Sequence, residues 1–121
     1  MYKLISHKYA QCGFDGYSSL NHERFFYSYQ TPIYSIFKER CGDVTSFRIK
    51  CINKPSYSVT AARQTTWSLY EELLHHDCAL YVRKLLQTCY YGMKIYVIRD
   101  MNAGVWCVFI GDKLMRTFKY E

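Results

Sequence analysis

The sequence lacks the composition of a flexible linker and the long apolar runs of a membrane protein. It has two prolines and six glycines in 121 residues, and no Pro/Gly/Ser-rich or low-complexity stretch divides it. No run approaches the roughly 20 apolar residues that span a bilayer, and residues 1–8 lack the apolar core of a secretion signal. We therefore expect a single domain over residues 1–121 that has no membrane partner and stays in the cytoplasm of the cell that makes it.

The sequence markers of common enzyme classes are also missing. There is no GxxxxGK[ST] phosphate loop, GxGxxG dinucleotide fingerprint, GxSxG nucleophile elbow or HExxH zinc motif. Adjacent acids such as Glu71 and Glu72 are more simply explained as a solvated helix face than as a catalytic pair. These absences favour a non-enzymatic protein with no catalytic residue and no cofactor, although an enzyme without these markers stays open.

The cysteines and histidines give little support for a metal site. None of the six cysteines forms a Cys-x-x-Cys pair, and without an export signal we expect them to be thiols in a reducing compartment. A tetrahedral zinc site is most easily built from two closely spaced ligand pairs. The nearest approach to such a site is the set His75, His76, Cys78 and Cys89. A polar helix junction with a buried thiol explains this set more simply, so no metal site is predicted.

The chain is rich in apolar, aromatic and positively charged residues. Half of its residues are apolar and 13 are tyrosines, so burial can offset the entropy lost on folding. Sixteen Lys and Arg against ten Asp and Glu give a formal charge of +6. That excess favours an acidic partner such as nucleic acid, a nucleotide or an acidic protein face. A basic surface that only keeps the protein soluble explains the charge equally well.

Segments rich in β-branched and aromatic residues predict strands in the first half of the chain. The candidates are residues 2–6, 25–29, 33–38 and 45–52. The polar stretch 11–23 is expected to be a loop, and an antiparallel meander fits the last three candidates. In the final one, Phe47, Ile49 and Cys51 alternate with Arg48 and Lys50, so both basic side chains should point to solvent from one face.

The apolar period changes to three and four residues between Trp67 and Cys89, which predicts an amphipathic helix. Thr60 is a candidate N-cap, and Gly92 is a candidate for the residue after the helix because glycine tolerates positive φ. About 30 residues is long for one globular helix. We favour two helices, with Asp77 capping a second helix over residues 78–91, although one bent helix would give the same period.

The last part of the chain returns to strand patterns over residues 94–99, 105–110 and 113–120. Gly111 and Asp112 lie between two of these runs and predict a two-residue hairpin with a type II′ turn. Together the elements predict an α+β fold, in which antiparallel strands at both ends of the chain pack on one bent or two consecutive central helices.

Basic residues interleaved with aromatic ones are the remaining functional signal, because such residues neutralise phosphates and stack on bases. The predicted partner- or nucleic-acid-binding residues, which we expect to lie close together, are Arg48, Lys50, Lys54 and Arg63. Further basic residues are Arg83, Lys84, Lys113, Arg116 and Lys119. A solvated basic edge explains the first four residues equally well.

Two short motifs lie within residues 25–64. The first reads Tyr27-Ser28-Tyr29-Gln30-Thr31-Pro32-Ile33, and the second reads Tyr57-Ser58-Val59-Thr60-Ala61-Ala62-Arg63-Gln64. They resemble a family of small bacteriophage proteins whose pattern is Ser-Tyr-x-Thr-x-Ile, then strands, then Tyr-Ser-x-Thr-Thr and a helix with a basic start. The chain departs from the pattern at Ala61, where a second Thr is usual, and at Gln64, where a His is usual. Any role of that Thr and His therefore does not transfer.

The resemblance implies a phage origin and a strand-rich start leading into a helix, but no activity or catalytic residue. By analogy of context, small phage proteins without catalytic motifs commonly bind and block host machinery. The leading hypothesis is a phage protein that acts in the host cytoplasm and inhibits a host protein or ribonucleoprotein, most of all a bacterial defence system, as an anti-CRISPR-like or similar anti-defence inhibitor. The alternatives are a basic nucleic-acid-binding protein and a sponge for a nucleotide signal. The oligomeric state stays open.

Overall fold

The computed structural model describes residues 23–28, 31–53, 59–88 and 92–119, and these contain strands, then two helices, then strands again. The first strands are β1 (Glu23–Ser28), β2 (Thr31–Cys41) and β3 (Val44–Cys51). The helices are α2 (Val59–Leu73) and α3 (His76–Thr88), and the last strands are β4 (Lys94–Asp100), β5 (Val105–Ile110) and β6 (Lys113–Lys119). The predicted strand 2–6 and all but the last residue of the predicted loop 11–23 lie outside the described residues.

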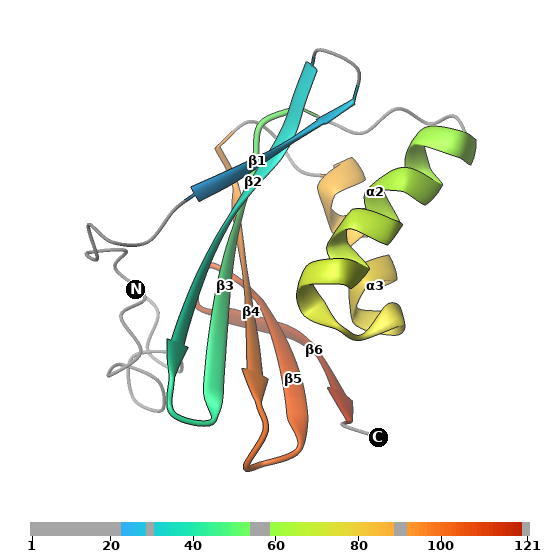
Figure 1. Ribbon diagram of the computed structural model, residues 1–121. Coiled ribbons are helices and arrows are strands. Elements are labelled where there is room, and N and C mark those ends of the chain that lie inside the picture. Colours follow the sequence, from blue (N-terminus) through green and yellow to red (C-terminus); the bar gives the residue numbers. More distant parts are fainter. Residues whose placement is uncertain (1–22, 29–30, 54–58, 89–91, 120–121) are drawn as a thin grey trace.

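All six strands belong to one antiparallel sheet, in the order β1-β2-β3-β4-β5-β6. β3 and β4 are hydrogen-bonded neighbours, from the pair Val44 and Asp100 to the pair Lys50 and Lys94, although both helices separate them in sequence. The predicted α+β class is therefore wrong, because a single sheet dominates the described residues and the helices only cover it (Figure 1). The order of strands and helices along the chain agrees with the prediction, but a local pattern cannot show which strands pair across the helices.

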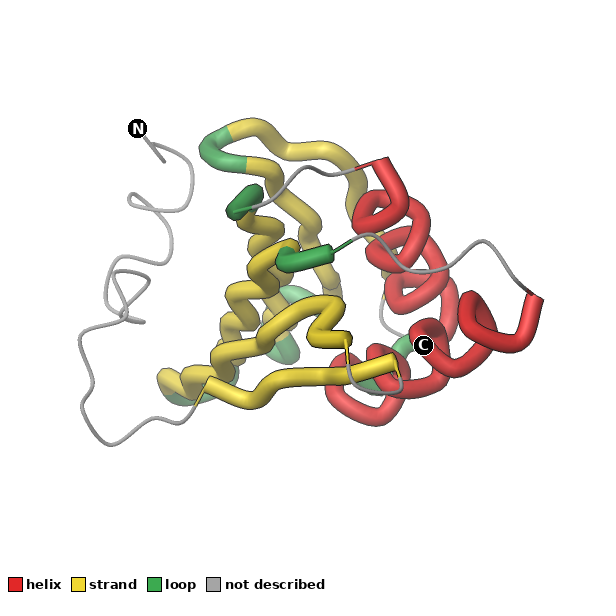
Figure 2. The backbone as a smooth tube through the Cα atoms, turned by 90° about the horizontal axis from the view of Figure 1, so that it is seen from above, coloured by secondary structure: helices red, strands yellow, loops and turns green. Residues whose placement is uncertain are grey.

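Both helices lie on the same face of the sheet, and the core is the layer between them (Figure 2). In β3, Phe47, Ile49 and Cys51 are at most 1% exposed and belong to this core, whereas Arg48 and Lys50 are only half-buried. The period of two predicted from the sequence is thus confirmed, and the two basic residues project from the face opposite the helices.

The helices contribute buried side chains at one-turn spacing, with Leu69 and Leu73 from α2 and Cys78, Val82 and Leu86 from α3. Fully burying one such leucine or valine is worth about 1.5–3 kcal/mol, so packing on the sheet holds the helices. Neither of these helices is long and apolar enough to cross a membrane.

The prediction of two helices is confirmed, but the junction between them is built differently from the prediction. Leu74 ends α2 with a φ of 62°, and its N–H donates to the carbonyl of Tyr70. The ring of His75 then caps α3, because its Nδ1 accepts a 3.1 Å hydrogen bond from the N–H of Cys78. Asp77 lies inside the first turn, where a carboxylate favours the positive end of the helix dipole, so the prediction of an Asp77 cap is wrong.

The other predicted helix ends are displaced. α2 already begins at Val59, so Thr60 is its second residue rather than its N-cap. α3 ends at Thr88, and Gly92 has the expected positive φ of 84° but leads into β4, where its N–H donates to the carbonyl of Cys51.

Two tight hairpins use glycine at their first turn position. Ile110 pairs with Lys113 across Gly111, whose φ is 62°, while the φ of Asp112 is not positive. This is the φ pattern of a type II′ turn, so the predicted hairpin is confirmed. Gly42, with a φ of 60°, occupies the same position between β2 and β3.

Leu74 offers a test of the helix junction. A positive φ costs a residue with a Cβ about 1 kcal/mol, and the side chain of Leu74 is 61% exposed, so it adds little packing in return. We expect Leu74→Gly to raise the free energy of unfolding by about 0.5–1 kcal/mol in urea denaturation. Leu74→Ala keeps the Cβ and should gain nothing, and a loss of stability in the glycine variant would contradict this description of the junction.

Candidate functional site

A row of side chains crosses the sheet beneath the helix junction. In the strand register, Arg40 pairs with Thr45, Thr45 with Arg99, and Arg99 with Trp106. Side chains directly opposite one another on antiparallel strands project from the same face. Arg99 Nη1 and Trp106 Nε1 both donate to the carbonyl of Leu73, at 3.4 and 3.3 Å, so the row lies on the face that the helices cover. We call these four residues the pocket row.

The pocket row lines a pocket where the helix layer ends. α2 stops at Leu73, whereas the β2–β3 and β4–β5 hairpins continue past the helices (Figure 1). The helices therefore do not cover the end of the sheet that carries these two hairpins. The pocket there has a volume of about 270 Å³ and is lined by the pocket row together with Gly42, Asp43, Leu74 and Met101.

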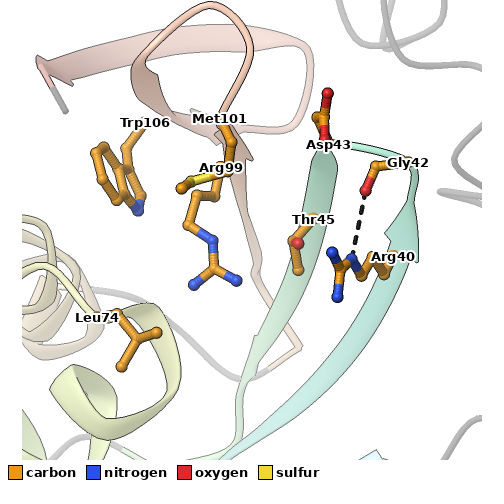
Figure 3. Close-up of a pocket in the computed structure, with 8 residues that line it drawn as sticks. All are labelled: Arg40, Gly42, Asp43, Thr45, Leu74, Arg99, Met101 and Trp106. Carbon is orange, nitrogen blue, oxygen red and sulfur yellow. Dashed lines mark hydrogen bonds between the residues drawn. The ribbon is translucent and has the colours of Figure 1, made fainter.

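The pocket lining carries more positive than negative charge. The guanidinium of Arg99 points into the space between Trp106 and Thr45, and Asp43 lies at the tip of the hairpin (Figure 3). Arg40 Nε donates to the carbonyl of Gly42 at 3.3 Å, and no described carboxylate forms an ion pair with Arg40. Two guanidinium groups and one carboxylate leave a net positive lining, and guanidinium groups bind carboxylate and phosphate oxygens in pairs.

The floor of the pocket is fixed by contacts with the core. The guanidinium of Arg99 lies 5.5 Å from the ring centroid of Phe47, in addition to its bond to Leu73. The ring of Trp106 is 4.7 Å from the ring of His75, and His75 Nε2 is 3.3 Å from the carbonyl oxygen of Lys119. Arg99 and Trp106 are thus held in place before any ligand arrives, which lowers the entropy cost of binding.

Part of the pocket lining is apolar. Leu74 and Met101 are 61% and 42% exposed, so both present hydrocarbon surface to solvent beside the arginines. A ligand with an anionic group next to an apolar group would match this lining.

The predicted binding residues do not form one cluster. Arg48 and Lys50 project together from the face opposite the helices, where the Arg48 guanidinium lies 4.7 Å from the ring centroid of Phe37. Arg63 is exposed on α2, so the sheet lies between it and this pair. Lys54 lies outside the described residues. The predicted proximity is therefore wrong for Arg63.

A basic residue that the sequence analysis did not select joins Arg48 and Lys50. Lys94 is directly opposite Lys50 in the strand register, and like charges in such a pair repel each other. Glu39 lies on the same face: burial raises the pKa of its carboxyl, and the charge of Arg48 partly offsets this. Arg48, Lys50 and Lys94 thus form a small basic patch on the face opposite the helices.

The residues considered for a metal site have structural roles. His75 uses both ring nitrogens, one in the α3 cap and one beside the carbonyl of Lys119. Cys78 is fully buried, and this burial raises the pKa of its thiol to about 12, so the thiolate that a metal requires is disfavoured. Within the described ranges, no three His, Cys, Asp or Glu side chains converge. Cys89 lies outside those ranges.

The thiols allow a test of this core. Cys51, Cys78 and Cys107 are thiols rather than disulfides, as predicted for these three, and Cys107 is only half-buried. We expect Cys78 to react with iodoacetamide at pH 8 at least tenfold more slowly than Cys107 in the folded protein, because it is buried and stays protonated. In urea the two rates should converge. Peptide mass mapping measures both rates, and fast labelling of native Cys78 would contradict its place in the core.

The pocket arginines were missed because the signal depends on the strand register. Ile95, Val97 and Arg99 lie on the helix face of β4, but residues 95–98 are all apolar. Without an alternation, the sequence of this strand does not indicate which face carries Arg99. The link between Arg99 and Arg40 required the β3–β4 pairing, which the sequence does not show.

No family model, no curated protein and no solved structure matches the chain. The pocket and its surroundings are therefore the basis for a functional proposal.

Proposed function

We propose that this chain is a non-enzymatic binding protein that holds an anionic group of its target in the basic pocket. One observation carries the proposal: Arg40 and Arg99, which are far apart in sequence, meet in one cross-strand row and line the same pocket. Thr45 stands between them and adds a hydroxyl, which can donate a hydrogen bond to a carboxylate or phosphate.

The size of the pocket supports a group rather than a large molecule. Small-molecule sites usually enclose about 300–1,000 Å³, and this pocket has about 270 Å³. A carboxylate or a phosphate fits inside, and the rest of a larger target would extend over Leu74 and Met101 at the rim.

The chemistry of the lining supports binding rather than catalysis. Among the described residues that line the pocket, Asp43 is the sole carboxylate and no His or Cys is present. The lining also holds the hydroxyl of Thr45, but among the described residues no hydrogen bond joins it to the Asp43 carboxylate, as a base and its nucleophile would be joined in most hydrolytic mechanisms.

The target that we propose is a component of a bacterial host, and first of all a defence system that the protein inhibits in the host cytoplasm. This part of the proposal is supported by the resemblance of residues 25–64 to small phage proteins and by the formal charge of +6. Filling the pocket with an acidic group of the host component would keep that group from its normal partner.

Calorimetric titration with inorganic phosphate, AMP and glutamate tests the proposal. We expect saturable 1:1 binding of at least one probe by the wild type, weaker binding at 500 mM than at 50 mM NaCl, and none by Arg40→Glu. The probe should be recovered intact after heat denaturation of the complex. Absence of binding for all three probes, or equal binding by the variant, would overturn the proposal, and conversion of the probe would show an enzyme.

A nucleic-acid-binding function is the second candidate, favoured by the patch of Arg48, Lys50 and Lys94 on the opposite face. It predicts that single-stranded DNA or RNA binds with an affinity that falls steeply with salt. In that case Lys50→Glu and Lys94→Glu would weaken binding and Arg40→Glu would not. Fluorescence anisotropy of a labelled oligonucleotide separates the two functions.

A further inference from the structure

An apolar ridge follows the last turns of α2 and the residue after it, and consists of Trp67, Tyr70 and Leu74. Trp67 and Tyr70 are about one turn apart on the helix, and Leu74 directly follows its last residue, Leu73. Trp67 is 60% exposed and Leu74 61%, and the rings of Trp67 and Tyr70 are 5.7 Å apart. Tyr70 is partly buried against the core, and exposed apolar side chains such as those of Trp67 and Leu74 mark interaction sites where they gather on a surface. We call these three residues the α2 ridge.

The α2 ridge is continuous with the basic pocket. Leu74 is the last residue of the ridge and also part of the pocket lining. Its positive φ of 62° costs backbone strain, and its exposed side chain gives the fold little in return. A strained residue at the boundary between two surface features fits a role in contacting a partner.

We propose that the α2 ridge and the basic pocket form one docking surface for a protein partner, which presents an apolar hollow beside an acidic side chain. This inference rests on the proposed function, because that acidic side chain is the anionic group that enters the pocket. The ridge fills the hollow, with Trp67 as its largest anchor. Trp, Tyr and Arg are the residue types that dominate binding energy in protein interfaces.

Charge on both sides of the ridge sets the chemistry of the partner. Arg63 is exposed one turn before Trp67, and Arg40 and Arg99 lie beyond Leu74. Glu71 is exposed on α2 and Asp43 lines the pocket, so the positive charges beside the ridge outnumber these two carboxylates by one. A surface with an excess of positive charge favours an acidic partner. A second copy of this chain, with its own formal charge of +6, would bring like charges together.

The extent of the ridge favours a protein over a free small anion. Leu74 lies eleven positions after Arg63, the basic residue before the ridge, which corresponds to about 17 Å at the usual rise of a helix. Trp67 lies about 10 Å along the helix from Leu74 by the same rise, so an anion in the pocket would leave Trp67 uncontacted. A standard protein interface of about 800 Å² per partner covers both features.

Site-specific photo-crosslinking in a bacterial lysate tests this inference. A benzophenone amino acid is placed at position 67, and in a matched protein at position 25, where Phe25 is 49% exposed on β1. We expect one protein to crosslink at position 67 and not at position 25, with the crosslink mapped beside an Asp or Glu. Pull-down of that protein by the tagged chain without the probe should fall at least tenfold in Trp67→Ser and in Arg40→Glu and stay unchanged in Phe25→Ser.

Other outcomes overturn the inference. These are crosslinks only to a second copy of the chain, crosslinks only to nucleic acid, capture that does not depend on Trp67, and no protein captured. Calorimetry of Trp67→Ser with the three anions is the companion measurement. If an anion still binds to Trp67→Ser while no protein depends on Trp67, the docking inference fails and the proposed function stands. If no anion binds to the wild type either, both fail.

Discussion

Replacement of Phe47 by alanine is expected to lower the free energy of unfolding by about 3–5 kcal/mol. Phe47 is 0% exposed in the middle of β3, and the charged ends of Lys38 and Arg99 lie 5.8 and 5.5 Å from its ring centroid. The variant removes buried surface, leaves a cavity and takes away the support beneath Arg99. Urea denaturation followed by circular dichroism at pH 7 measures the loss.

The matched control is Phe25→Ala, because Phe25 is half exposed on β1. Its loss should stay below about 1 kcal/mol, as is usual for surface positions. Similar losses at the two positions would contradict a core that is centred on β3 and covered by both helices.

Charge reversal at Arg40 is expected to weaken phosphate binding at least tenfold, which corresponds to about 1.4 kcal/mol. Arg40→Glu removes one of the two guanidinium groups and adds a second carboxylate beside Asp43, so the lining becomes net negative. Arg40 is exposed and its side chain donates a hydrogen bond to the carbonyl of Gly42, so the fold should survive. Isothermal titration calorimetry with inorganic phosphate measures the change.

Lys113→Glu supplies the same change in net charge away from the pocket. Lys113 is exposed and five residues along β6 from Phe118, which pairs with Trp106 of the pocket row. That separation is about 17 Å at the usual rise of a strand, so this variant should bind phosphate nearly as well as the wild type. Equal losses in the two variants would show that the protein's overall charge, and not the pocket, attracts the anion.

The sequence predicted the local elements because each has a clear period. The alternation of Phe47, Ile49 and Cys51 identified β3 and its buried face, and steps of three and four residues identified the helices. Gly111 was the signal that predicted the hairpin between β5 and β6. These features depend on neighbours within a few residues, which a single sequence contains.

The fold class could not be predicted in the same way. The decisive feature is the pairing of β3 with β4 across both helices, which depends on packing between distant segments. Arg48 and Lys50 share a face because of the strand period, but Arg63 does not join them, since the helices cover the opposite face. The basic pocket could not be predicted for the same reason. Arg40 and Arg99 become neighbours of Thr45 only in the assembled sheet.

The helix junction shows how a side chain can replace an expected cap. Asp is a strong N-cap residue, which favoured Asp77, but the Nδ1 of His75 accepts the bond instead. The ring of His75 also packs on Trp106 at 4.7 Å. Packing on the sheet thus selects the histidine, and the same contact supports the pocket floor.

The emission of Trp106 tests the anion-binding pocket most directly. The chain has two tryptophans; Trp67 is 60% exposed on α2, and Trp106 is 3% exposed at the pocket. In Trp67→Phe, all tryptophan emission comes from Trp106. Titration of this variant with inorganic phosphate should give a saturable change in emission, and Trp67→Phe combined with Arg40→Glu should give none. No change in the first protein, or an equal change in both, would contradict the claim that this pocket binds an anionic group.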